Sequence, residues 1–113
     1  MSFVQQFWQK NLQEVYKDVK ESRDAKEATL KSDCFSKNSK NQEGFNTCLR
    51  NFYDEFSKFQ LRVEYEQRRV FECLQELKKG GGANQEVQKM CLRGVLDQLK
   101  SHANQYKENI QKN

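Results

Sequence analysis

Proline is absent from the 113-residue sequence, and glycine occurs only five times. Three of the glycines are consecutive, at 80–82, and the stretch 45–79 contains neither glycine nor proline. Glycine and proline are the residues that most often end helices, so their scarcity favours long helices. The many Gln, Lys and Glu residues agree with this, because all three are good helix formers.

Long apolar runs are also missing. No segment approaches the roughly 18 apolar residues of a membrane-spanning helix. The N-terminus, MSFVQQFWQK, lacks the continuous apolar core of a secretory signal and the arginines of a cleaved mitochondrial presequence. Hydrophobic residues make up 35% and charged residues 32%, and the mean hydropathy is −1.07. A helical seam needs only about two apolar residues in seven, so this composition favours one elongated helical domain over 1–113.

The net charge of +4 is small and shows no large patch of one sign. Basic pairs such as Arg68-Arg69 and Lys78-Lys79 stand among glutamates, which is typical of solvated helix faces. We therefore expect no nucleic-acid partner. Eight Phe, four Tyr and one Trp argue against a disordered chain.

The stretch 45–79 organises the rest of the chain. Its apolar residues recur in steps of four and three, interrupted only by Glu66, which predicts a long helix with one apolar stripe. The stripe consists of Phe45, Leu49, Phe52, Phe56, Phe59, Val63, Val70, Cys73 and Leu77. We expect its middle phenylalanines in the core. The competing interpretation places them on the outside as a docking surface.

Two further helices are predicted to pack on this stripe. The segment 3–33 has helical apolar spacing and begins with Phe3, Phe7 and Trp8. We favour core packing for these aromatic residues, and they are also our candidate contacts for a partner or lipid. The segment 84–111 has Asn84 as a plausible N-cap. Its own seam is Leu92, Leu96, Leu99, Ala103, Tyr106 and Ile110. The prediction is an all-α, up-down-up bundle of three long helices, about 3–33, 45–79 and 84–111, joined by a loop at 35–43 and the glycine turn.

Four cysteines constrain how the helices fold back on each other. Within one continuous helix, Cys48 and Cys73 would lie about 37 Å apart, whereas a disulfide needs Cα atoms within roughly 7 Å. Cys34 and Cys48 each lie seven residues from Asn41, in the first loop. Cys73 and Cys91 are likewise equidistant from the glycine turn. We therefore predict the disulfides Cys34–Cys48 and Cys73–Cys91, each closing one hairpin.

The sequence offers little chemistry for catalysis. The cysteine pairs would lie at opposite ends of a rod, so they cannot share a zinc ion. His102 is the only histidine and is expected to be a solvated or packed helix residue. Carboxylates such as Asp54, Glu55, Glu64 and Glu66 are expected in ion pairs along helix faces. The three glycines lack the GK[ST] of a phosphate-binding loop. We expect no enzyme, no metal and no cofactor.

The cysteine pairs without a signal peptide resemble the twin-cysteine (CHCH-like) proteins of the mitochondrial intermembrane space. In that family, cysteines on facing helices are oxidised on import, guided by apolar residues one helical turn away. The same relation occurs here in Leu30/Cys34, Cys48/Phe52, Cys73/Leu77 and Val87/Cys91. The resemblance covers about 30–95. The spacings of thirteen and seventeen residues and the side-by-side bridges depart from the usual nested Cys-x9-Cys pattern. The Cys-Cys pair of copper carriers is missing, so copper delivery is not implied.

This resemblance implies an accessory subunit of a respiratory-chain or ATP-synthase complex, on the intermembrane-space side of the mitochondrial inner membrane. Its partners would be protein subunits of that assembly, and it would be peripheral to the membrane at most. One alternative is an assembly factor or chaperone of the same compartment. Another is a secreted or cytosolic helical binding module for apolar ligands.

Overall fold

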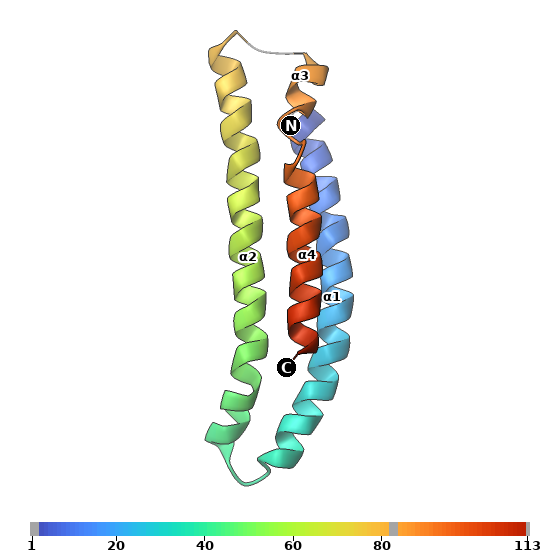
Figure 1. The fold of residues 1–113 in the computed structure, drawn as a ribbon, viewed down its shortest axis with the longest axis vertical. Helices are drawn as coiled ribbons and strands as arrows, with labels where there is room; N and C mark the ends of the chain where they lie inside the picture. The colour runs from blue at the N-terminus through green and yellow to red at the C-terminus, as the bar shows by residue number, and fades with distance from the viewer. Residues whose placement is uncertain (1–2, 82–83, 113) are drawn as a thin grey trace.

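The computed structural model describes residues 3–81 and 84–112, and these residues form four α-helices without a strand. The helices are α1 (Phe3–Lys37), α2 (Gln42–Lys79), α3 (Gln85–Lys89) and α4 (Val95–Gln111). They form a rod of 64 × 21 × 20 Å. Figure 1 shows α1 and α4 running in one direction and α2 running in the other. The predicted all-α, up-down-up bundle is therefore confirmed.

The hairpin between α1 and α2 is tighter than predicted. Helix α1 extends to Lys37 and α2 begins at Gln42, so only residues 38–41 connect them. Asn41 caps α2, because its side-chain oxygen accepts a hydrogen bond from the backbone N–H of Gly44 at 3.0 Å. Gly44, which directly follows the predicted loop 35–43, lies in the first turn of α2.

The predicted third helix, 84–111, is wrong in one respect, because a turn at 90–94 divides it into α3 and α4. Gly94 has a φ of +73°, a left-handed conformation that interrupts the helical path and suits glycine. Leu92 remains buried within the turn. The apolar spacing therefore predicted which residues are buried but not that the backbone leaves the helix. The predicted N-cap is present, since Asn84 accepts a hydrogen bond from the N–H of Val87 at 3.0 Å.

The core contains the apolar stripes of all three long helices. Phe52 and Phe59 are fully buried, whereas Phe56 is half-buried at the edge of the core. The ring of Phe59 lies 5.8 Å from that of Tyr16 on α1 and 5.3 Å from that of Tyr106 on α4. The middle of the α2 stripe therefore faces the neighbouring helices, as predicted. The buried seam of α4 comprises Val95, Leu99, Ala103, Tyr106 and Ile110.

Glu66 interrupts the apolar stripe of α2 and is nevertheless buried, with 2% of its surface exposed. Its carboxylate accepts a hydrogen bond from Arg69 at 3.0 Å and lies 3.2 Å from Nε2 of His102 on α4. The expected ion pair of Glu66 with an arginine is therefore present, and its carboxylate is buried in the seam. His102 is a packed residue that joins α4 to α2.

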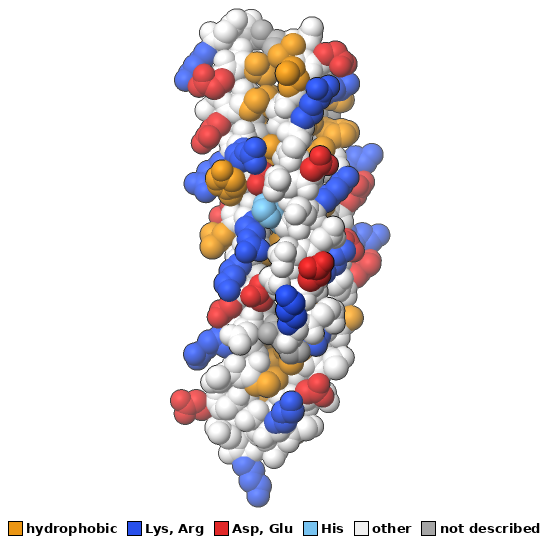
Figure 2. Space-filling model, in the orientation of Figure 1, with side chains coloured by type: hydrophobic (Ala, Val, Ile, Leu, Met, Phe, Trp, Pro, Cys, Tyr) orange, Lys and Arg blue, Asp and Glu red, His pale blue; other side chains and the backbone are white. Residues whose placement is uncertain are grey.

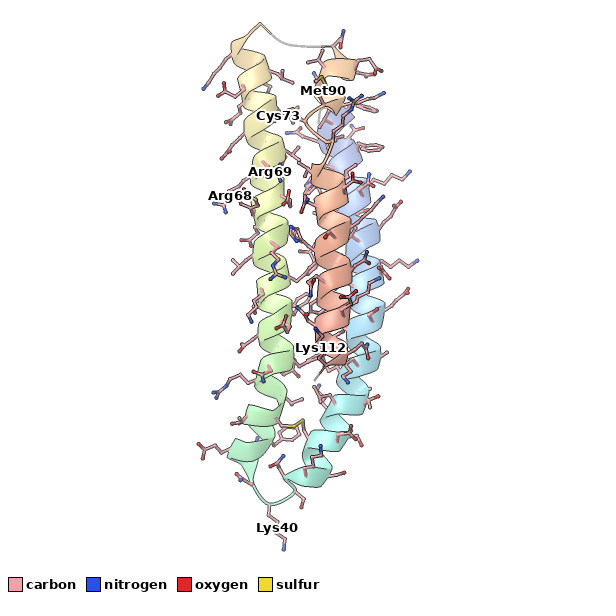
Figure 3. The ribbon with its side chains drawn as sticks, in the orientation of Figure 1. Lys40, Arg68, Arg69, Cys73, Met90 and Lys112 are labelled. Carbon is pink, nitrogen blue, oxygen red and sulfur yellow. A yellow bond between two sulfur atoms is a disulfide. The ribbon has the colours of Figure 1, made fainter. Side chains whose placement is uncertain are left out.

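Both predicted disulfides are present. Cys34 is bonded to Cys48 with a Cα–Cα distance of 5.8 Å, and Cys73 to Cys91 with a distance of 5.6 Å. The first bond closes the α1–α2 hairpin, and the second attaches the 90–94 turn to α2. Figure 3 shows Lys112, at the end of α4, well short of Lys40 at the tip of the first hairpin. The rod therefore has three helices over most of its length and only α1 and α2 at that tip (Figure 1).

Candidate functional site

The three aromatic residues that begin the chain lie in different environments. The side chain of Trp8 is fully buried, whereas Phe3 is 37% exposed and Phe7 is 40% exposed. The rings of Phe3 and Phe7 stack on each other with centroids 6.1 Å apart. Trp8 is therefore a core residue, and only Phe3 and Phe7 are accessible to a partner.

Beside these two rings is a pocket of about 540 Å³, which we term the apical pocket. Four segments contribute to it: the first turns of α1, the short helix α3, the turn at 90–94, and the first turn of α4. Its lining residues are Phe3, Phe7, Glu86, Lys89, Leu92, Arg93, Gly94, Leu96 and Asp97. The volume lies within the range of about 300–1,000 Å³ that is typical of ligand pockets.

The interruption of the third helix creates this pocket. Gly94 lines it at the position where the backbone turns, and the Cys73–Cys91 bond attaches the same turn to α2. Helix α3 is thereby placed against α1, where the ammonium of Lys89 lies 5.5 Å from the ring centroid of Phe3. A continuous helix over 84–111 would have no such turn beside the phenylalanines.

The pocket combines apolar rings with a polar rim of both signs. Lys89 pairs with Glu86 at 3.2 Å. Arg93 forms no side-chain hydrogen bond or ion pair within the described part of the chain, and neither does Asp97. Such an apolar floor with unpaired charges at its edge can bind a bulky apolar group and hydrogen-bond the polar groups next to it.

The structure reveals no arrangement typical of acid–base or nucleophilic catalysis at this pocket. Across residues 3–81 and 84–112, no group of His, Cys, Asp and Glu side chains is placed to hold a metal ion. None of the described helices is long and apolar enough to cross a membrane.

Sequence reasoning selected Phe3 and Phe7 but missed the residues from α3 and the following turn. The apolar spacing places Leu92 and Leu96 only in the predicted seam of the third helix, and no pattern in the sequence indicates Arg93 as a pocket residue. Gly94 was the one available signal, because an isolated glycine inside a helical pattern lowers the expectation of an unbroken helix.

Comparison with protein-family models, with curated proteins and with solved structures found no match. The fold and the site therefore define this chain as a disulfide-stapled all-α bundle with an apolar pocket at one end.

Proposed function

We propose that this chain is a non-catalytic protein-binding subunit that anchors a partner protein at the apical pocket. The observation that supports this most directly is the exposed Phe3–Phe7 pair, held beside a pocket on a rigid scaffold. Other large apolar side chains are exposed as well, including Phe35, Tyr53, Leu61 and Tyr65, but Phe3 and Phe7 are the pair that stacks on each other and lines the apical pocket. Exposed aromatic residues that adjoin a pocket are typical anchor positions in protein interfaces.

A protein occupant suits the pocket better than a small apolar molecule. Phe3 and Phe7 remain well exposed, so a small ligand seated on them would stay partly in water. A bulky side chain projecting from a partner would be covered by its own protein on the open side. The surrounding charges of Arg93 and Asp97 would then lie at the polar rim of the interface.

The two disulfides support an oxidising compartment for the folded protein. Our specific proposal is the mitochondrial intermembrane space, with this chain as an accessory subunit of a respiratory-chain or ATP-synthase complex. It rests on the resemblance to twin-cysteine proteins. Intact mass measured with and without reduction, after alkylation in the cell, tests the compartment. Four free thiols in cells would contradict it.

Native-gel mass spectrometry of tagged variants expressed in the source cells tests the docking proposal. The wild-type chain should migrate stoichiometrically with a larger complex, and Phe7→Ser should lose that association. Phe35→Ser is the matched control, because Phe35 is an exposed phenylalanine near the other end of α1. Equal migration of wild type and Phe7→Ser, or loss of association in the control alone, would contradict docking at the apical pocket.

A further inference from the structure

A second surface lies on the outer side of α2, away from the apical pocket. Three of the six arginines in the chain fall between 62 and 69. Two apolar side chains accompany them, Leu61 with 64% and Tyr65 with 54% of its surface exposed. We term this surface the arginine face and define it as Leu61, Arg62, Tyr65, Arg68 and Arg69. Figure 3 labels Arg68 and Arg69 on α2.

The positive charge of this face is not neutralised within the bundle. Arg62 and Arg68 form no hydrogen bond or ion pair in the part of the chain that the structure describes. Glu64 and Glu72 each lie one helical turn from Arg68, and neither is paired with it. The guanidinium groups of Arg62 and Arg68 are therefore free to donate hydrogen bonds to an external anion.

Arg69, unlike Arg62 and Arg68, forms an ion pair within the bundle and packs on Tyr65 at the centre of the face. Its guanidinium pairs with the buried carboxylate of Glu66 at 3.0 Å and lies 5.9 Å from the ring centroid of Tyr65. Glu66 Oε1 is also 3.2 Å from Nε2 of His102, so both carboxylate oxygens are engaged and neither pairs with Arg62. The guanidinium of Arg69, held by Glu66, therefore packs on the ring of Tyr65, which lies between Arg62 and Arg68 along α2.

The composition of this face differs from that of the other charged surfaces. Several exposed lysines of the rod are paired with a glutamate one turn earlier, as in Lys58–Glu55 and Lys79–Glu76. Figure 2 shows charges of both signs spread along the visible side of the rod. Arginine and tyrosine are enriched in protein interfaces, whereas lysine and glutamate are depleted there. The planar guanidinium also binds carboxylates through two parallel hydrogen bonds, which an ammonium cannot do.

We propose that the arginine face binds an acidic amphipathic helix of a partner protein. Carboxylates two turns apart on that helix would pair with Arg62 and Arg68, which lie about 9 Å apart along α2, and an apolar residue between them would contact Leu61 and Tyr65. The face extends over only about 12 Å of helix, which matches two turns of a partner. An anionic membrane fits less well, since the exposed carboxylates of Glu64 and Glu72 flank the face and would be repelled by a continuous negative surface.

The proposal is tested with a fluorescent synthetic helical peptide of about 20 residues that carries Glu at i and i+7 on one face and Leu at i+3 and i+4 between them. The comparison peptide has Gln in place of Glu. Binding to the full oxidised chain is followed by fluorescence anisotropy. The test variant is Arg62→Gln/Arg68→Gln, because neither side chain has a partner to lose among the described residues. The matched control is Lys17→Gln/Lys20→Gln, which removes the same charge from exposed positions on α1.

The acidic peptide should bind the wild type and the lysine control equally and should bind the double arginine variant about tenfold more weakly. Arg62→Lys/Arg68→Lys should recover only part of that loss, since it keeps the charge without the bidentate geometry. Equal binding of the Glu and Gln peptides would overturn the proposal, as would an equal loss in the lysine control. It would also be overturned if vesicles of phosphatidylserine and phosphatidylcholine bound the wild type while the acidic peptide did not. Phe7→Ser should leave peptide binding unchanged, which separates this surface from the apical pocket.

Discussion

Phe59 lies at the centre of an aromatic cluster that joins all three long helices, so Phe59→Ala measures how much of the stability comes from the middle of the rod. The side chain is fully buried, and its ring contacts those of Tyr16, Phe56 and Tyr106 at centroid distances of 5.3–6.2 Å. Truncation removes the ring and leaves a cavity that three neighbouring rings cannot fill without moving.

The expected loss is about 3–5 kcal/mol in the free energy of unfolding, as for other buried phenylalanines. A domain of this size has a total of about 5–15 kcal/mol. A chain of 113 residues shifts its melting temperature by about 4 °C per kcal/mol. Phe59→Ala should therefore melt about 12–20 °C below the wild type.

The disulfides do not compensate for this loss. Along α2, Phe59 is about 17 Å from Cys48 and about 21 Å from Cys73, so each bond constrains a hairpin end and not the central cluster. Both disulfides should remain intact in the variant, and mass spectrometry under non-reducing conditions verifies this.

Circular-dichroism melts of the oxidised proteins provide the measurement. Leu61→Ala is the control, because it truncates an apolar residue two positions away that is largely exposed. The control should melt within about 2 °C of the wild type. If Phe59→Ala also melted within 2 °C, the middle of the α2 stripe would not be the core, and the competing interpretation of it as a docking surface would be correct.

Three further substitutions test other features of the interior. Burial raises the pKa of Tyr106 from 10.0 to about 12, and its hydroxyl has no hydrogen-bond partner among the described residues. The folded state therefore favours the neutral phenol, and this contribution to stability is complete below pH 10 and lost as the pH rises toward 12. Tyr106→Phe should reduce this alkaline loss and raise the melting temperature at pH 7 by a few degrees, which melts across a pH series would measure. Glu66→Leu should destabilise the bundle by about 1–3 kcal/mol, because it removes the carboxylate that pairs with Arg69 and contacts the mostly buried His102, and an unchanged or higher midpoint in denaturant would contradict this. Gly94→Ala should destabilise it by about 1 kcal/mol because of the positive φ, whereas the control Gly80→Ala should not, because its φ is negative and a Cβ there would meet only the Leu77 carbonyl oxygen, at an ordinary contact distance of 3.6 Å.

Local patterns in the sequence determined the architecture of this protein. The spacing of apolar residues predicted the long helices, and the glycine run predicted the turn after α2. The cysteine spacings predicted both disulfides, since residues equidistant from a turn face each other across a hairpin. These features depend on residues that are near one another along the chain or on the fixed geometry of a helix.

The tertiary structure alone decided the features on which the proposed function depends. Phe7 and Trp8 are adjacent in the sequence, and only the packing of α1 against its neighbours places one ring outside and the other inside. Glu66 lies in an otherwise apolar seam, where its carboxylate contacts the imidazole of His102, 36 residues away in the sequence. The apical pocket needed the left-handed turn at Gly94, which the apolar spacing does not reveal because Leu92 and Val95 stay buried on either side of it. Periodicity records which residues are buried, whereas the pocket and the buried charge arise from contacts between segments that are far apart in the chain.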